Sequence, residues 1–128
     1  MLETNFENTK KKLLIVDDSD LSHRFLNNIC SVFGFDIVNL KRGRDALELL
    51  RTKKFDCMLL DLLMPDMTGF EVLEYLQQNS MQIPVIVISA DIQTTTYNKV
   101  ISLGAKSMLK KPPKENQLRE IFTELAII

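Results

Sequence analysis

Three short runs of consecutive apolar residues constrain the fold of this chain more than any other feature. They occupy residues 13–16 (LLIV), 57–60 (CMLL) and 85–88 (VIVI). Continuous apolar runs of this length are typical of parallel strands that are buried on both faces. Two weaker strands are predicted at residues 36–40 and 107–110.

Segments with helical spacing lie between and after the predicted strands. Three helices are predicted at about residues 44–52, 69–78 and 94–103. Two more carry apolar stripes that we expect to face the core: Leu21, Phe25, Ile29 and Val32 in the first, and Leu118, Ile121, Phe122 and Leu125 in the last. Thr68 and Glu71 have the spacing of a capping box, and Gly34 and Gly104 stand where helices commonly end.

The strict alternation of five strands with five helices predicts an α/β fold. Such a pattern implies right-handed crossovers and a parallel sheet covered by helices on both faces. We expect a flavodoxin-like three-layer sandwich with strand order 2-1-3-4-5, in which ligands bind beyond the carboxyl ends of strands 1 and 3. The 128 residues fit one domain at residues 12–128, preceded by a polar N-terminal tail at residues 1–11.

Composition excludes several classes of protein. No apolar run approaches the roughly 20 residues that span a bilayer, and the N-terminus lacks the apolar core of a signal peptide, so we expect a cytoplasmic protein without membrane contact. The net charge of −1 offers no basic face for direct nucleic-acid binding. Cys30 and Cys57 lie in apolar segments without a CxxC partner, and we interpret both as reduced core residues.

Polar side chains follow the predicted central strands where each strand ends. Asp17 and Asp18 follow the first strand, Asp61 the third and Ser89 the fourth, while Lys111 follows the fifth. Carboxylates about 4 Å apart repel by about 4 kcal/mol at an effective dielectric constant of about 20, so such a cluster favours a bound cation. Oxygen ligands without histidine or cysteine favour Mg²⁺ and argue against zinc. The alternative is that these acidic residues only cap helices.

The residues at the strand ends form a set with a familiar order and spacing. The segments are LIVDD (14–18), LDLLMPDMTG (60–69), ISA (88–90), GA (104–105) and KP (111–112). Together they resemble the receiver domain of two-component response regulators, of the kind represented by chemotaxis regulators. The resemblance covers residues 12–126, and the whole set is far more specific than any one segment.

The resemblance implies a phosphorylation site that uses Mg²⁺ or Mn²⁺. Asp61 corresponds to the phosphoacceptor, and therefore to the nucleophile. Asp18 corresponds to a direct metal ligand, Asp17 to a ligand that acts mostly through water, and Leu63 to a ligand through its backbone carbonyl. Positioning and charge neutralisation are the main sources of catalysis in phosphoryl transfer, and this set supplies both.

The resemblance also implies three contacts to the phosphoryl oxygens: Ser89, the backbone of Ala90, and Lys111. Lys110 and Lys111 face opposite sides of a strand, so only one of them can reach the pocket. We choose Lys111 because it precedes Pro112, where the family often has a cis peptide. Lys110 is then a solvated side chain.

Three positions depart from the family pattern or bear on the lifetime of the phosphoryl group. Met108 stands where the family commonly has a switch aromatic, so the aromatic part of the switching mechanism is not carried over. Leu63 and Asp91 flank the expected route of an attacking water, and an apolar Leu63 cannot orient water, which predicts slow self-dephosphorylation.

His23, the single histidine, is predicted to be a surface residue near the partner-docking helix.

The favoured function is a phosphorylation switch. The resemblance implies that the phosphoryl donor is a sensor histidine kinase or a His-phosphotransfer protein. An output protein is expected to bind the helix at 94–103, the strand at 107–110 and the last helix. Because the sequence stops at Ile128, directly after that helix, we expect either a receiver without an output domain or a receiver fragment of a larger regulator or hybrid kinase.

Two other functions use the same architecture. An aspartate-nucleophile phosphohydrolase would share Asp61 and Mg²⁺, but it needs a second acid two residues later, where this chain has Leu63. A flavin binder needs a Gly- or Ser/Thr-rich phosphate loop after the first strand, where this chain has the acidic segment at 17–20. We therefore expect a signalling protein and not an enzyme.

Overall fold

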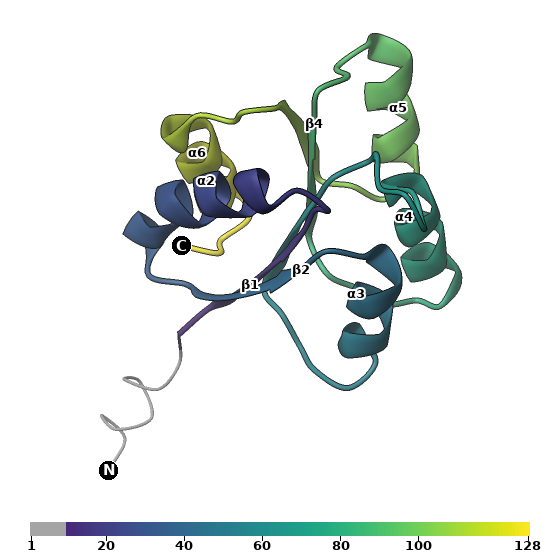
Figure 1. Cartoon of the computed structure of the whole chain (residues 1–128), viewed down its shortest axis with the longest axis horizontal. Helices are drawn as coiled ribbons and strands as arrows, with labels where there is room; N and C mark the ends of the chain where they lie inside the picture. Colours follow the sequence, from purple (N-terminus) through teal and green to yellow (C-terminus); the bar gives the residue numbers. More distant parts are fainter. Residues whose placement is uncertain (1–9) are drawn as a thin grey trace.

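The computed structural model describes residues 10–128 as alternating strands and helices around one sheet (Figure 1). Residues 1–9 of the predicted tail lie outside the described residues. The strands are β1 (Lys12–Val16), β2 (Asp36–Leu40), β3 (Cys57–Leu60), β4 (Val85–Ser89) and β5 (Ser107–Lys110). The helices are α2 (Asp20–Cys30), the short 3-10 helix η1 (Ser31–Phe33), α3 (Gly43–Leu50), α4 (Gly69–Gln78), α5 (Thr94–Ser102) and α6 (Glu115–Glu124).

The sheet has the predicted order, β2-β1-β3-β4-β5, and every pair of neighbouring strands is parallel. The register aligns the carboxyl ends of the strands, because Val16 pairs with both Leu40 and Leu60, and Ser89 pairs with Lys110. The predicted flavodoxin-like fold is therefore confirmed. Its consequence is that the residues after β1 and β3 emerge side by side at one edge of the sheet.

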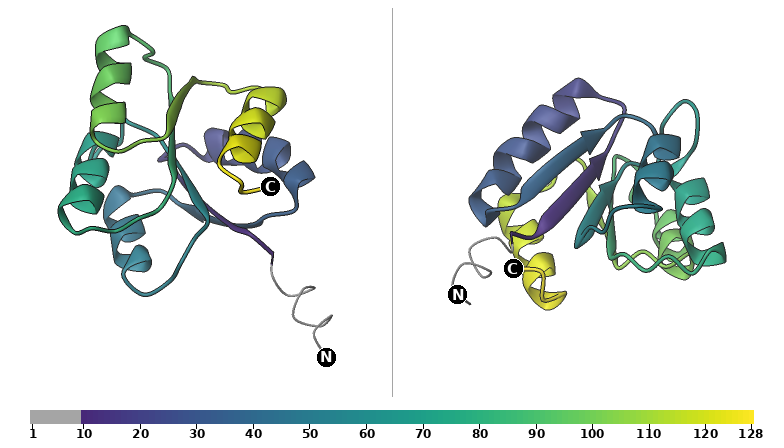
Figure 2. Two further views of the ribbon diagram at one scale, coloured as in Figure 1. Left: turned by 180° about the vertical axis from the view of Figure 1, so that it is seen from behind. Right: turned by 90° about the horizontal axis from the view of Figure 1, so that it is seen from below.

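Helices cover both faces of the sheet. In Figures 1 and 2, α2 and α6 lie on one side, and α3, α4 and α5 lie on the other. Alternate residues of β1 pack into the two core clusters on opposite faces of the sheet. Leu13 and Ile15 pack on the α2/α6 side, and Leu14 and Val16 pack on the opposite side. This arrangement explains the runs that are apolar on both faces. No helix among residues 10–128 is both long and apolar enough to cross a membrane.

The predicted apolar stripe of α2 is wrong except at Ile29, which packs against the core. Leu21 is 73% exposed and Phe25 is 39% exposed, and the helix packs on the sheet through another stripe. That stripe consists of His23, Leu26 and Cys30, at positions i, i+3 and i+7. The helix thus leaves Leu21 and Phe25 on its solvent-exposed side.

The capping box and the two glycines that the sequence singled out lie at helix ends, as predicted. Thr68 and Glu71 form the predicted capping box at the start of α4. Gly34 and Gly104 adopt φ values of 77° and 106°, which lie in the left-handed region that favours glycine. Gly69 is fixed by close packing, because an added Cβ would lie 2.6 Å from the backbone oxygen of Asp61. The start of α4 therefore packs directly on the backbone that carries Asp61.

Both cysteines are buried and free, as predicted. Burial raises the pKa of the Cys30 thiol to about 12 and also raises the pKa of Cys57. These thiols stay protonated at neutral pH and serve as small apolar core residues.

Candidate functional site

Three carboxylates meet at the carboxyl ends of β1 and β3. Ligand atoms from Asp17, Asp18 and Asp61 all lie within 4.8 Å of one another. Asp17 and Asp61 are almost fully buried, whereas Asp18 is exposed. Two of the charges are thus shielded from water while the third borders solvent.

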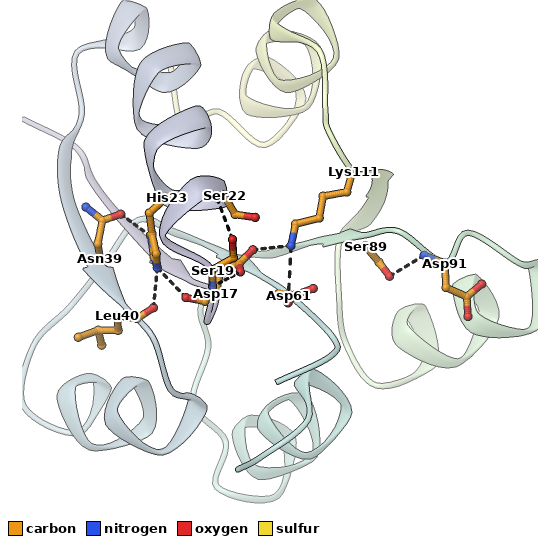
Figure 3. A network of polar contacts seen from close by, with 10 residues as sticks. All are labelled: Asp17, Ser19, Ser22, His23, Asn39, Leu40, Asp61, Ser89, Asp91 and Lys111. Carbon is orange, nitrogen blue, oxygen red and sulfur yellow. Dashed lines mark hydrogen bonds and ion pairs between the residues drawn. The ribbon is translucent and has the colours of Figure 1, made fainter. Parts of the chain in front are cut away.

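The ammonium group of Lys111 lies beside the two buried carboxylates (Figure 3). Lys111 Nζ is 2.7 Å from Asp17 Oδ2 and 3.7 Å from Asp61 Oδ2. Its backbone N–H donates to the carbonyl oxygen of Ser89, which fixes where the chain leaves β5. Lys110 is exposed, and the peptide between Lys111 and Pro112 is cis, in agreement with the expected geometry of this loop.

The electrostatics of the cluster centre on Asp61. Burial and the charge of Asp17 raise the pKa of Asp61 to about 6, with a smaller contribution from Asp18, although Lys111 and the Leu63 backbone amide lower it. One ammonium therefore compensates these carboxylates only in part. The site at neutral pH carries an excess of negative charge.

The donor set fits a hard divalent cation. All three acidic side chains offer oxygen atoms, and Asp17 Oδ2 is buried without an aligned hydrogen bond, although it is paired with Lys111. His23 lies close by, which the sequence did not predict, but its ring nitrogens contact backbone carbonyls and Asn39. An all-oxygen cluster suits Mg²⁺ or Mn²⁺ better than zinc.

The Ser89 hydroxyl is directed away from this cluster. Its oxygen accepts the backbone N–H of Asp91 at 3.1 Å, and Figure 3 shows the side chain turned toward that residue. The Asp91 carboxylate in turn accepts the Gln93 N–H at 3.0 Å and the Thr96 hydroxyl at 3.0 Å. Ser89 and Asp91 are therefore tied to the start of α5, and Ala90 is exposed between them.

Leu63 and Met108 occupy different surroundings. The Leu63 side chain is 67% exposed at the rim of the site, so it provides no polar group beside Asp61. Met108 is partly buried and packs against the core cluster on the side of α3, α4 and α5. It lines a surface groove of about 330 Å³ together with Tyr97 and Ile92.

His23 is not the surface residue that was predicted. It is 8% exposed because α2 turns its other stripe toward solvent. Its ring lies between the Asp17 and Leu40 carbonyls on one side and Asn39 on the other (Figure 3). The signal in the sequence was the spacing of His23 to Leu26 and Cys30, which a search for purely apolar stripes overlooks.

The comparisons with known proteins identify the family. A family model described as the response regulator receiver domain matches residues 13–123. The chain belongs to the response regulator receiver domain family. Its receiver fold is shared by the signal receiver domain of a putative Luxo repressor protein from Vibrio parahaemolyticus, with a TM-score of 0.85 and 28% identity over 91% of this chain and 89% of that one.

Curated relatives contain this receiver domain as one part of a longer chain. The Regulator of RpoS from Escherichia coli (strain K12) is 38% identical over 112 residues, which are 87% of this chain and 33% of the relative. The two-component response regulator ORR24 of Oryza sativa subsp. japonica is 38% identical over 113 residues, or 87% of this chain and 18% of the relative. The receiver domain described here thus spans a third or less of the length of these relatives.

Proposed function

We propose that this receiver domain accepts a phosphoryl group on Asp61 from a phosphorylated histidine and passes the signal on through a change in its surface. The observation that carries the proposal is the meeting of three carboxylates at the switch point of the sheet, two of which are nearly buried and contact Lys111. A structural ion pair with Lys111 alone does not need three clustered carboxylates.

The transfer step uses groups from this chain. An Asp61 carboxylate oxygen attacks the phosphorus of a phosphohistidine, the new P–O bond forms as the P–N bond breaks, and the histidine nitrogen leaves with the bonding electron pair and takes up a proton. Lys111 lies close enough to pair with the transferred phosphoryl oxygens. The product is an acyl phosphate on Asp61.

Asp17, Asp18 and Asp61 are proposed to hold Mg²⁺ or Mn²⁺, with a further ligand from the Leu63 carbonyl. When bound, the cation supplies positive charge to the carboxylates and to the phosphoryl oxygens. The excess negative charge of the cluster and the raised pKa of Asp61 support this assignment.

The exposed face of α2 is proposed to dock the phosphodonor. A groove of about 460 Å³ lies between α2 and the loop after β5, and its lining is almost entirely apolar: Leu21, Ser22, Phe25, Leu26, Lys111, Pro112 and Pro113. Lys111 belongs both to this groove and to the acidic cluster. A donor whose histidine must reach Asp61 has to sit beside that cluster, so an apolar helical surface of the donor is the occupant that fits.

The output surface is proposed to lie on α5, β5 and α6, where Tyr97, Met108 and Lys110 line a shallow groove. Ser89 connects the phosphorylation site with this surface, since its side chain is turned toward the Asp91 N–H and a rotation toward a phosphoryl oxygen would carry it away from that contact. Phosphorylation therefore favours a changed start of α5. We propose no enzymatic turnover, because the apolar Leu63 withholds a second acid.

Acetyl phosphate tests this function without knowledge of the natural donor. We expect the intact mass to rise by one phosphoryl group in the presence of Mg²⁺ and to stay unchanged in EDTA. Asp61→Asn should not be modified, whereas Asp56→Asn, at a position before β3, should behave like the wild type. Modification without Mg²⁺, or in the Asp61 variant, would contradict the proposal.

A further inference from the structure

Three polar side chains join the metal-binding end of β1 to β2, and none of them lies in the acidic cluster. They are His23 and Asn27 of α2 and Asn39 of β2. His23 Nε2 lies 2.7 Å from the backbone oxygen of Asp17 and 3.1 Å from that of Leu40. Carbonyl and amide oxygens only accept hydrogen bonds, so Nε2 donates to both strand ends, and Nδ1 must likewise carry a proton to donate to the side-chain oxygen of Asn39.

The two asparagines hold the imidazole in this orientation. His23 Nδ1 is 2.8 Å from Asn39 Oδ1, and the same oxygen accepts from Asn27 Nδ2 at 2.8 Å. Asn27 Nδ2 also donates to the backbone oxygen of His23, and Asn39 Nδ2 returns a bond to Asn27 Oδ1 at 3.2 Å. The ring is therefore braced on its Nδ1 side while its Nε2 faces the strand ends.

The group that His23 contacts belongs to a residue of the acidic cluster. Asp17 N–H donates to the Leu40 oxygen at 3.1 Å, so β2 fixes the amide side of this residue and His23 fixes its carbonyl side. Asp17 Oδ1 accepts the Ser19 N–H at 2.9 Å, which limits rotation of the side chain. Because Asp18 follows directly, the direction of both carboxylates depends on this anchored peptide.

We propose that His23, braced by Asn39 and Asn27, is a positioning residue that holds the Asp17–Asp18 backbone in the geometry for divalent-cation binding. The proposal rests on the proposed function, since it assumes that these carboxylates bind Mg²⁺. Residues that orient metal ligands commonly change metal affinity by about 10-fold or more when they are substituted. His23 touches neither the phosphoryl group nor the reacting atoms, so its loss should weaken cation binding while the transfer step at Asp61 is kept.

Two substitutions of His23 distinguish the contact that its Nε2 makes with the Asp17 carbonyl from the contact that its Nδ1 makes with Asn39. Glutamine places an amide nitrogen about where Nε2 lies and can still donate to the Asp17 carbonyl, whereas asparagine reaches only as far as Nδ1 and Asn39. We expect the Mg²⁺ dissociation constant, measured by isothermal titration calorimetry, to stay within about 3-fold of wild type in His23→Gln and to rise about 10-fold or more in His23→Asn.

The rate of phosphorylation by acetyl phosphate gives a second readout. In His23→Asn the Mg²⁺ concentration for half-maximal rate should rise by the same factor, while the rate at saturating Mg²⁺ stays near that of wild type. Asn28→Ala, an exposed neighbour on α2, is the matched control and should change neither quantity. Urea unfolding without Mg²⁺ measures the effect of each substitution on stability separately.

The outcomes distinguish failure of the proposed Mg²⁺ site from failure of the proposed positioning role of His23. If the wild type binds no Mg²⁺, the proposed function fails. If the wild type binds Mg²⁺ and the asparagine and glutamine variants bind equally well, the positioning role is overturned and the proposed function stands. If His23→Asn does not fold, Asn39→Ala, which removes the brace at an exposed position, takes its place. Unchanged Mg²⁺ affinity in Asn39→Ala would also overturn the positioning role of His23.

Discussion

The surroundings of Asp61 disfavour the charged form of its carboxyl group. Its pKa in the folded protein is about 6, above the usual 3.8 of an aspartate side chain, so the folded state binds a proton more tightly than the unfolded state. The free energy of unfolding therefore falls as the pH rises from about 4 to about 6. Above that range the whole cost of holding Asp61 charged in the folded state is present.

Asp61→Asn should remove this penalty. In the absence of divalent cations at pH 8, we expect the variant to have a free energy of unfolding higher than that of wild type by roughly 2 kcal/mol, with no difference below about pH 4. Urea denaturation at both pH values checks this. Saturating Mg²⁺ should stabilise the wild type more than the variant, and a less stable variant at pH 8 would contradict the assignment.

Leu63 presents an apolar side chain at the rim of the site, where a polar one could orient a water molecule. We expect Leu63→Asn to shorten the lifetime of the acyl phosphate by about 10-fold, which is less than the ~100-fold or more that a full general base provides. Decay of the phosphorylated mass after removal of acetyl phosphate measures it. Leu63→Met is the control, and a wild-type lifetime of only seconds would contradict the account.

At the scale of single elements, the start of α5 is hydrogen-bonded to residues that follow β4. Ser89, Asp91 and Thr96 form a chain of hydrogen bonds from β4 to the first turn of the helix. We propose that these hydrogen bonds are the route by which Ser89 acts on α5.

Asp91→Ala should loosen the first turn of α5 before any phosphorylation occurs. The substitution removes the two hydrogen bonds that the carboxylate accepts from Gln93 and Thr96, each of which contributes about 1 kcal/mol. Amide hydrogen exchange of residues 94–97 should become several-fold faster in the unphosphorylated variant, and phosphorylation should change it less than in wild type. Equal protection in the two proteins would contradict a role for Asp91 in the coupling.

The exposed stripe of α2 can be tested separately from the chemistry. We expect Phe25→Glu to slow phosphotransfer from a phosphorylated His-phosphotransfer protein by about 10-fold or more, as for loss of an interface anchor, without slowing reaction with acetyl phosphate. Val32→Glu, at an exposed position in η1 beyond the helix, is the control. A similar loss with both phosphodonors would indicate damage to the site instead of to docking.

At the scale of the whole molecule, the sequence predicted the fold because its signals are local and repeated. The apolar runs, the Thr68–Glu71 cap and the glycines at 34 and 104 each determine structure within a few residues. Parallel topology then places the strand ends together without further information, so the meeting of Asp17 and Asp61 could be expected.

What the sequence did not predict depends on contacts between distant elements. The burial of His23 is determined by which stripe of α2 meets the sheet and by Asn39 on β2. The direction of the Ser89 hydroxyl depends on the path of the loop after β4, which brings the Asp91 N–H to it. In both cases the pairing partner is chosen by backbone geometry that no local pattern encodes.

The site of phosphorylation is the central claim, and chemical trapping tests it most directly. After reaction with acetyl phosphate and Mg²⁺, borohydride reduces an aspartyl phosphate to homoserine, and peptide mass spectrometry locates the altered residue. The account predicts homoserine at position 61 alone, dependent on Mg²⁺. Homoserine at position 17 or 18, or none at all despite a phosphorylated intact mass, would contradict it.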